Sequence, residues 1–85
     1  MNDRYALYQT DTFVSDLKNL DPTTKGALRK SLSKILEDPL RFKPLKGRPA
    51  YHRIRIGVYR LIYKLDGTSI ILLYFKKRDT VYERL

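Results

Sequence analysis

Residues 51–76 constrain the fold most, because three apolar runs there are separated only by two short turn signals. Gly57 interrupts the first pair of runs, and Asp66 with Gly67 separates the second pair. Glycine readily adopts the positive φ angles that tight hairpin turns require. We therefore expect three consecutive antiparallel strands, at about residues 51–56, 58–65 and 68–76.

Two amphipathic helices are expected upstream of these strands. The first is capped by Thr10 or Asp11, ends near residue 20, and has its apolar residues at helical spacing, at Phe13, Leu17 and Leu20, with Val14 beside them. The second begins at Asp21 and Pro22, since aspartate caps a helix and proline fits its first position. Pro39 ends it. Its apolar stripe consists of Leu28, Leu32, Ile35 and Leu36.

The remaining segments complete one small domain. Residues 4–10 are a strand candidate, and residues 39–50, rich in proline, are expected to form a loop held to the core by Leu40, Phe42 and Leu45. A chain of 85 residues is too short for a second core. The order β-α-α-β-β-β predicts a single α+β domain over residues 1–85, in which a helical hairpin packs on one face of a mostly antiparallel four-stranded sheet.

Positive charge is abundant and concentrated. Eighteen Lys and Arg residues against nine Asp and Glu residues give a formal charge of +9. The stretch between Asp38 and Asp66 has no acidic residue but contains Arg41, Lys43, Lys46, Arg48, Arg53, Arg55, Arg60 and Lys64. Small basic domains are typical partners of nucleic acid, anionic membranes or acidic proteins.

Strand alternation places three of these arginines on one face of the sheet. Arg53 and Arg55 share a side, whereas His52 points to the other. A two-residue turn at Gly57 places Arg60 opposite Arg53 or Arg55, depending on whether the turn is 56–57 or 57–58. If the Asp-Gly turn pairs Leu65 with Thr68, the helix-covered face consists of Tyr59, Leu61, Tyr63, Leu65, Ile70, Leu72 and Tyr74.

Opposed like charges on neighbouring strands cost about 0.2–1 kcal/mol, so an uncompensated arginine cluster indicates an anion-binding site. The competing interpretation is an ordinary solvated face, or pairing with Asp66, Asp79 or Glu83. Arginine suits phosphate because its planar fork donates two hydrogen bonds and stays charged. Base stacking is a candidate role for Tyr51, Tyr59, Phe75 and Tyr82.

Several chemistries are absent from the sequence. With no cysteine and the single His52, which we expect to be packed in the core, there is no disulfide framework, structural zinc site or cofactor motif. The longest apolar stretch, residues 70–75, is far below the roughly 20 residues that span a bilayer. The first ten residues do not resemble a signal peptide. We therefore expect a cytoplasmic protein with neither a cofactor nor a membrane partner.

These residues resemble the RelE/ParE toxin superfamily, nearest the RelE branch. The resemblance rests on Leu-Lys-Gly at 45–47, "RIRIGVYRLIY" at 53–63 and the closing R-D-x-V-Y at 78–82, and it covers nearly the whole chain. It implies a microbial RNase fold and a toxin of a type II toxin-antitoxin system. Such a toxin enters the ribosomal A site and cleaves mRNA by attack of the 2′-hydroxyl, which leaves a 2′,3′-cyclic phosphate and inhibits translation. Its implied partners are a RelB-like antitoxin, acidic and helical, and mRNA on the ribosome.

The resemblance also implies roles for individual residues. Arg60 steadies the transition-state phosphate, and Arg53 and Arg55 stand where well-known members carry lysines. Lys76 or Arg78 supplies a further basic group. The implied catalytic residues are Arg60, Arg53, Arg55, Tyr82 and Arg78. The implied RNA contacts are Lys43, Lys46, Arg48, Lys76 and Lys77.

Arginine remains protonated and is a poor general base. If the chain cleaves RNA as the resemblance implies, either Tyr82 or Lys46 assists the 2′-hydroxyl, or catalysis rests mostly on electrostatics and on geometry imposed by the ribosome. Two alternative functions fit the same chain: a ParE-like inhibitor of DNA gyrase, and a non-catalytic homologue that binds RNA or a partner.

Overall fold

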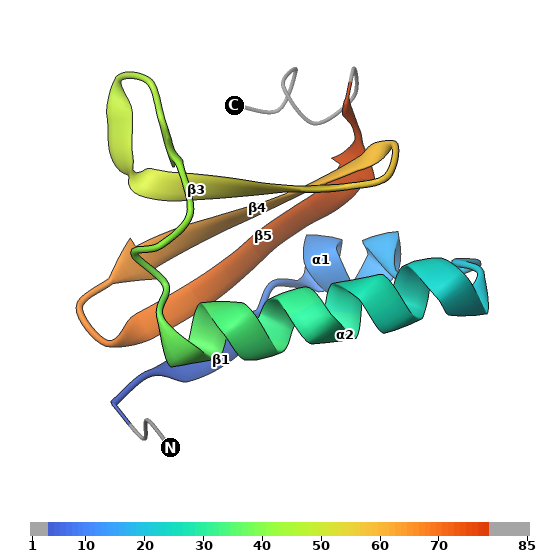
Figure 1. The fold of residues 1–85 in the computed structure, drawn as a ribbon, viewed down its shortest axis with the longest axis horizontal. Coiled ribbons are helices and arrows are strands. Elements are labelled where there is room, and N and C mark those ends of the chain that lie inside the picture. Colours follow the sequence, from blue (N-terminus) through green and yellow to red (C-terminus); the bar gives the residue numbers. More distant parts are fainter. Residues whose placement is uncertain (1–3, 79–85) are drawn as a thin grey trace.

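Residues 4–78 are described in the computed structural model, and they form one sheet with two helices on one of its faces (Figure 1). The elements are β1 (Ala6–Gln9), α1 (Asp11–Asp16), α2 (Pro22–Glu37), β2 (Pro44–Leu45), β3 (Arg48–Ile56), β4 (Tyr59–Asp66) and β5 (Ser69–Lys77). The strand order is β1-β5-β4-β3-β2, with β1 parallel to β5 and the other pairs antiparallel. The α+β prediction is confirmed, and β2 is an additional short strand.

Side-chain caps begin both helices where the sequence predicts. The Thr10 hydroxyl accepts a hydrogen bond from Phe13 N at 3.0 Å, and the Asp21 carboxylate accepts one from Thr24 N at 3.0 Å. The Thr24 hydroxyl donates a second bond to Asp21 at 2.6 Å, and these bonds lower the pKa of Asp21. Helix α1 ends at Asp16, earlier than expected, and Asn19 turns the chain with a φ of 66°.

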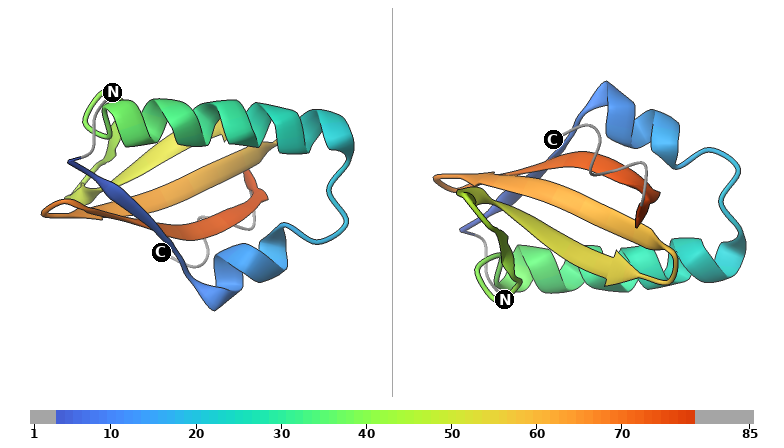
Figure 2. Two further views of the ribbon diagram at one scale, coloured as in Figure 1. Left: turned by 90° about the horizontal axis from the view of Figure 1, so that it is seen from below. Right: turned by 90° about the horizontal axis from the view of Figure 1, so that it is seen from above.

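The two helices lie on the same face of the sheet but contact different strands. Helix α1 contacts β5, whereas α2 contacts β3 (Figure 2). Leu28 and Ile35 of α2 are buried as predicted, whereas Leu32 and Leu36 are half-buried and Val14 of α1 is 48% exposed. The fully buried side chains between helices and sheet are Phe13, Ile35, Leu61, Tyr63, Ile70, Leu72 and Phe75.

Glycine occupies the first position of both two-residue hairpin turns. Gly57 has a φ of 60° and Gly67 a φ of 59°, and no non-glycine residue in these turns has a positive φ, as in type II′ turns. The second turn is therefore Gly67 with Thr68, so Leu65 pairs with Ile70. The predicted pairing of Leu65 with Thr68 was wrong because it placed Asp66 inside the turn.

A β-bulge in β5 reverses the predicted orientation of Tyr74 on the sheet. Ile62 pairs with Tyr74 but Tyr63 pairs with Leu72, so Leu73 is an extra residue. Phe75, rather than Tyr74, consequently faces the helices. The bulge lies where the β1 pairing ends at Leu72, and the Thr10 hydroxyl lies 3.0 Å from the carbonyl oxygens of both Leu72 and Leu73.

The segment at residues 39–50 is not simply a loop. Pro44 belongs to β2, which is at the edge of the sheet, and Pro49 belongs to β3 but precedes Tyr51, where the pairing of β3 with β4 begins. Gly47, with a φ of 78°, turns the chain between these strands. Leu40 is 65% exposed, contrary to expectation, and Pro39 is the fully buried residue at this end of α2.

Two side chains of the sheet hold residues 39–42 in place. The Tyr63 hydroxyl donates a hydrogen bond of 2.5 Å to the Pro39 carbonyl, and burial together with the Asp38 carboxylate raises the pKa of Tyr63. The predicted packing of His52 is confirmed. Its ring stacks on Tyr63 with 5.1 Å between centroids, and Nδ1 lies 3.0 Å from the Phe42 carbonyl oxygen.

Candidate nucleic-acid interface

The sheet face opposite the helices carries a row of cations, which we call the cationic row: Arg55, Arg60 and Lys76. The register pairs Arg55 with Arg60, and Arg60 with Lys76, across β3, β4 and β5. Of the two registers open from the sequence, the structure has the one with the turn at residues 57–58. Adjacent strands are about 4.8 Å apart, so three side chains of like charge start side by side.

Arg60 is the most constrained member of the row. It is only 7% exposed, and its Nη1 donates to the carbonyl oxygens of Tyr59 at 2.9 Å and Gly57 at 3.3 Å. Within residues 4–78, its Nε and Nη2 donors have no partner. No fully buried side-chain nitrogen there lacks a hydrogen bond, so this edge reaches the surface. The Nε–Nη2 edge of a guanidinium is suited to gripping two oxygens of one phosphate.

The other two predicted arginines flank Arg60 on β3. Arg55 is exposed directly opposite it, and Arg53, opposite Ile62, is half-buried. The amide of Arg53 donates to the Lys43 carbonyl at 3.2 Å, which ties the β2 segment to β3. The structure thus brings all three predicted arginines onto one face, with Arg60 fixed by the turn and Arg55 open to solvent.

Lys76 is held by an acid that the sequence did not reveal. Its ammonium group forms an ion pair with Asp16 at the end of α1, and the same carboxylate accepts a 3.0 Å hydrogen bond from Phe75 N. The Asp16 side chain is 8% exposed. A separation of 60 residues between the partners gives no local sequence signal for this pair.

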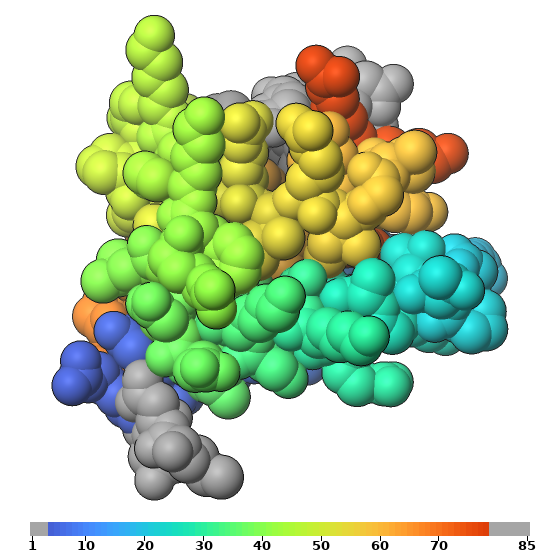
Figure 3. Space-filling view, in the orientation of Figure 1, coloured from blue at the N-terminus to red at the C-terminus, as the bar shows by residue number. Residues whose placement is uncertain are grey.

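The other predicted RNA contacts divide into two groups. Lys43, Lys46 and Arg48 are exposed in and around the β2–β3 hairpin. Lys77 alternates with Lys76 and pairs with Tyr59, so its side chain starts on the opposite face from the cationic row. In Figure 3 separate columns of side chains, coloured lime to yellow, project from the side of the molecule away from α2.

Of the predicted residues near the chain end, Arg78 is exposed, and its amide donates to the Val58 carbonyl at 3.2 Å. This bond places Arg78 beside the β3–β4 turn that anchors Arg60. Tyr82 lies outside the described residues, as do Asp79 and Glu83.

The predicted stacking residues differ in their access. Phe75 is 1% exposed and stacks on Tyr59 with 4.9 Å between ring centroids, so the prediction that Phe75 stacks on a base was wrong. Tyr51 is half-buried and shares the alternation of Arg53. The Arg48 guanidinium and the Lys64 ammonium each lie 5.8 Å from the Tyr51 ring centroid.

The described part of the chain shows no group of three His, Asp or Glu side chains that could hold a metal ion. Nor do its helices include one long and apolar enough to cross a membrane. What this face offers is positive charge, a guanidinium edge with unused donors, and the partly accessible aromatic rings of Tyr51 and Tyr74.

Comparison with known proteins identifies the class of protein. The model of the ParE toxin of the type II toxin-antitoxin system parDE matches residues 7–82. The chain is 33% identical over 82 residues to toxin RelE3 of Methanocaldococcus jannaschii, with 85% of this chain and 89% of the relative covered. The chain therefore belongs to the RelE/ParE family of type II toxin-antitoxin toxins.

Solved structures support the RelE branch. The RelB-RelE antitoxin-toxin complex from Methanococcus jannaschii matches with a TM-score of 0.74 and 26% identity over 91% of this chain and 96% of that chain. The RelBE2 toxin-antitoxin complex from Mycobacterium tuberculosis matches with a TM-score of 0.73 and 30% identity over 88% and 99% of the two chains. The chain is thus a type II toxin of the RelE family.

Proposed function

We propose that this toxin inhibits translation by cleaving mRNA in the ribosomal A site. The observation that carries the proposal is Arg60, whose Nη1 is fixed by the turn while its Nε–Nη2 edge has no protein partner in the described chain. Arg55 lies directly opposite Arg60. Two guanidinium groups placed in this way would stabilise the charge that develops on a phosphate during cleavage.

The proposed reaction is an internal transfer. The 2′-oxygen attacks the adjacent phosphorus, the bond from phosphorus to the 5′-oxygen breaks, and the products are a 2′,3′-cyclic phosphate and a 5′-hydroxyl. The 2′-hydroxyl loses a proton and the leaving oxygen gains one, so no cofactor is needed. In this scheme Arg60, Arg53 and Arg55 contact the phosphate, and Lys43, Lys46 and Arg48 hold neighbouring phosphates.

A site made of arginines is poorly suited to proton transfer. Guanidinium groups remain protonated at physiological pH, so they stabilise charge but accept protons poorly. We propose that Tyr82 or Lys46 assists the 2′-hydroxyl, or that the ribosome supplies most of the acceleration by fixing the reacting atoms in line. Slow cleavage of free RNA is the expected consequence.

We further propose a RelB-like antitoxin as the partner of this toxin. The related toxins of Methanococcus jannaschii and Mycobacterium tuberculosis are found in complexes with their antitoxins. A formal charge of +9 favours an acidic partner.

Inhibition of DNA gyrase is the second candidate function, because the family model that matches residues 7–82 describes a ParE toxin. A programmed translation extract and purified gyrase, each with and without the toxin, separate the two. The proposal predicts cleaved mRNA and unchanged supercoiling. Loss of supercoiling with intact mRNA would favour the ParE-like function, and binding of RNA without either effect would favour a non-catalytic homologue.

A further inference from the structure

The bulge in β5 places Tyr74 on the open face of the sheet, by which we mean the face opposite the helices. Leu73 is the extra residue of the bulge, and Tyr74 pairs with Ile62 of β4. Neither Tyr74 nor Ile62 belongs to the hydrophobic cluster beneath the helices. Bulges re-aim side chains and are over-represented next to active sites. The bulge therefore exchanges a core position for a position on the face that carries the cationic row.

Tyr74 lies within reach of Arg60. Ile62 follows Arg60 by two residues on β4 and therefore shares its face. It pairs with Arg53 on one side and with Tyr74 on the other, so these three form a row next to the cationic row. Arg60 and Tyr74 are diagonal neighbours on paired strands, about 7–8 Å apart, a separation that aromatic and long side chains can span. One nucleotide could contact both side chains.

The ring of Tyr74 has no partner of its own within residues 4–78. It is half-buried, and its side chain makes no hydrogen bond, ring stack or cation contact there. No fully buried side-chain oxygen in that range lacks a hydrogen bond, so the hydroxyl group reaches the surface. Tyr51, which shares this face, differs because the Arg48 and Lys64 cations lie 5.8 Å from its ring centroid. Tyr74 is therefore the better placed of the two rings to receive a ligand.

A free aromatic ring beside a fixed guanidinium is the combination that binds single-stranded RNA. Proteins of this kind hold phosphates with cations and stack the bases on tyrosine or phenylalanine rings. Ile62, which is fully buried next to Tyr74, gives the ring an apolar neighbour on the sheet. The position of Tyr74 thus suits the flat face of a nucleobase.

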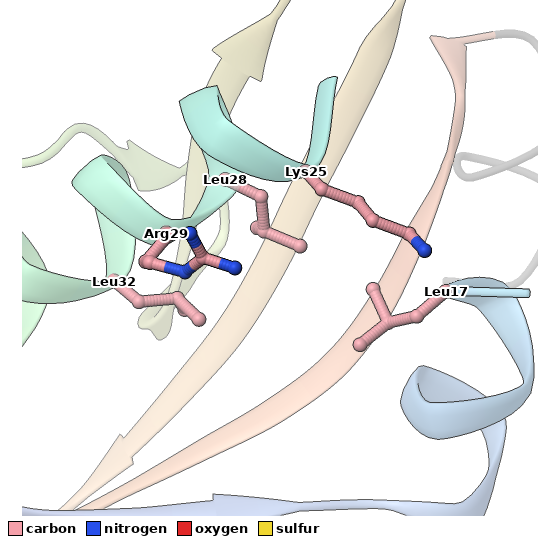
Figure 4. Close-up of a pocket in the computed structure, with 5 residues that line it drawn as sticks. All are labelled: Leu17, Lys25, Leu28, Arg29 and Leu32. Atoms are coloured by element: carbon pink, nitrogen blue, oxygen red, sulfur yellow. The ribbon is translucent and has the colours of Figure 1, made fainter. Parts of the chain in front are cut away.

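The hollow on the helix side of the molecule offers no such combination. It has a volume of about 350 Å³ and lies between the end of α1 and the first half of α2 (Figure 4). Its lining has no aromatic residue and consists of Leu17, Lys25, Leu28, Arg29 and Leu32. A base stacked there would also lie on the face opposite the cationic row. Base stacking is therefore expected on the open face.

We propose that Tyr74 stacks on the base of the mRNA nucleotide adjacent to the phosphate that Arg60 grips. The inference rests on the RNA cleavage of the proposed function and adds a base contact to a site otherwise made of phosphate contacts. Base and phosphate are joined through the ribose, so holding both restricts the position of the 2′-oxygen relative to the phosphorus. Tyr74 would thereby help to set the geometry of the reacting atoms.

A thermodynamic cycle between the ring and the base tests the proposal. The probe is a short single-stranded RNA with fluorine in place of each 2′-hydroxyl, which cannot be cleaved because the attacking oxygen is absent. Matched RNAs lack one base at successive positions, and fluorescence anisotropy measures their affinity for the full-length toxin. Loss of one particular base should weaken wild-type binding about 5- to 100-fold. Two groups that contact each other are not additive, so removing both costs no more than removing one.

The variants separate the ring from other roles of the residue. Tyr74→Leu keeps an apolar side chain next to Ile62 and should bind the intact RNA as weakly as wild type binds the RNA without that base. Its further loss on removing the base should be less than about twofold. Tyr74→Phe keeps the ring and should retain the base dependence. Thermal unfolding establishes that each variant is folded before its affinity is compared.

Two matched controls accompany these variants. Tyr8→Leu removes a tyrosine that is 55% exposed and pairs with Ile71, farther from the cationic row, and it should leave the base dependence unchanged. Tyr74→Leu should leave the slope of log affinity against log salt unchanged, because no phosphate contact is lost. Arg55→Ala should make that slope shallower by about 0.7.

Full base dependence in Tyr74→Leu would overturn the inference, as would equal wild-type affinity for every RNA of the series or no binding at all. Weaker binding of the antitoxin by Tyr74→Leu, with RNA binding unchanged, would also overturn it and assign the ring to that partner. Failure of the proposed function gives a different result. Intact ribosomal mRNA with wild-type toxin would refute cleavage, while the measured cycle between ring and base would still establish the stacking.

Discussion

Asp16 at the end of α1 forms an ion pair with Lys76 of β5. The same carboxylate caps the edge of β5 at Phe75 N, beyond the point where β1 has left the sheet. One end of the cationic row is therefore neutralised by the protein, while Arg55 and Arg60 have no acid opposite them on the sheet. On this face Lys76 is therefore paired within the protein, whereas Arg55 and Arg60 can bind an anionic ligand.

Asp16→Asn should release Lys76 to the RNA. Asparagine still accepts the bond from Phe75 N but no longer holds the ammonium group, so the variant should gain one phosphate contact. The slope of log affinity against log salt for a short single-stranded RNA should become steeper by about 0.7. Fluorescence anisotropy at several salt concentrations measures this slope.

The lysine itself supplies the control. Lys76→Ala added to Asp16→Asn should restore the wild-type slope, and Lys76→Ala alone should leave it unchanged. If Lys76→Ala alone makes the slope shallower by the same amount, Lys76 already contacts RNA and the ion pair does not withhold it.

Tyr63→Phe should destabilise the fold by about 1–3 kcal/mol, since it leaves the carbonyl of fully buried Pro39 without its donor. Urea denaturation measures the loss. Tyr8→Phe removes the hydroxyl of a residue 55% exposed and should change stability by less than about 0.5 kcal/mol. Equal effects of the two variants would mean that the bond to Pro39 contributes nothing specific.

The cap of α2 should make stability depend on acid. Hydrogen bonds from Thr24 lower the pKa of Asp21 below its ordinary value of 3.8, so the ionised cap stabilises the fold above that pH. The contribution is lost as the pH falls below 3.8 and through the lowered pKa. Asp21→Ala should therefore be less stable than wild type at pH 7, with the difference shrinking in strong acid. Urea unfolding of wild type and Asp21→Ala at pH 7 and in strong acid measures this difference in stability, and Asp66→Ala is the control at an exposed position. A difference that stays the same at both pH values would contradict the role of Asp21 as a cap.

Alternation and turn chemistry were enough to predict the arginine face, because Arg53, Arg55 and Arg60 share a side in either register of a two-residue turn at Gly57. The side of the sheet on which Tyr74 lies could not be predicted, because the bulge at Leu73 occurs where the pairing of β1 with β5 ends. The pairing of Asp16 with Lys76 depends on where α1 packs, which its six residues do not specify locally. Long-range contacts of this kind determine which cationic side chains are available to bind RNA.

Primer extension on ribosome-bound mRNA tests the central claim most directly, with wild-type toxin and Arg60→Ala compared at equal amounts of folded protein. Wild type should produce breaks within the A-site codon, and Arg60→Ala should reduce them by at least about 100-fold, because it removes the donors poised for the phosphate. Arg60→Lys, which keeps the charge without the fork, should recover only part of the cleavage. Intact mRNA with wild-type toxin, or full cleavage by Arg60→Ala, would contradict the account.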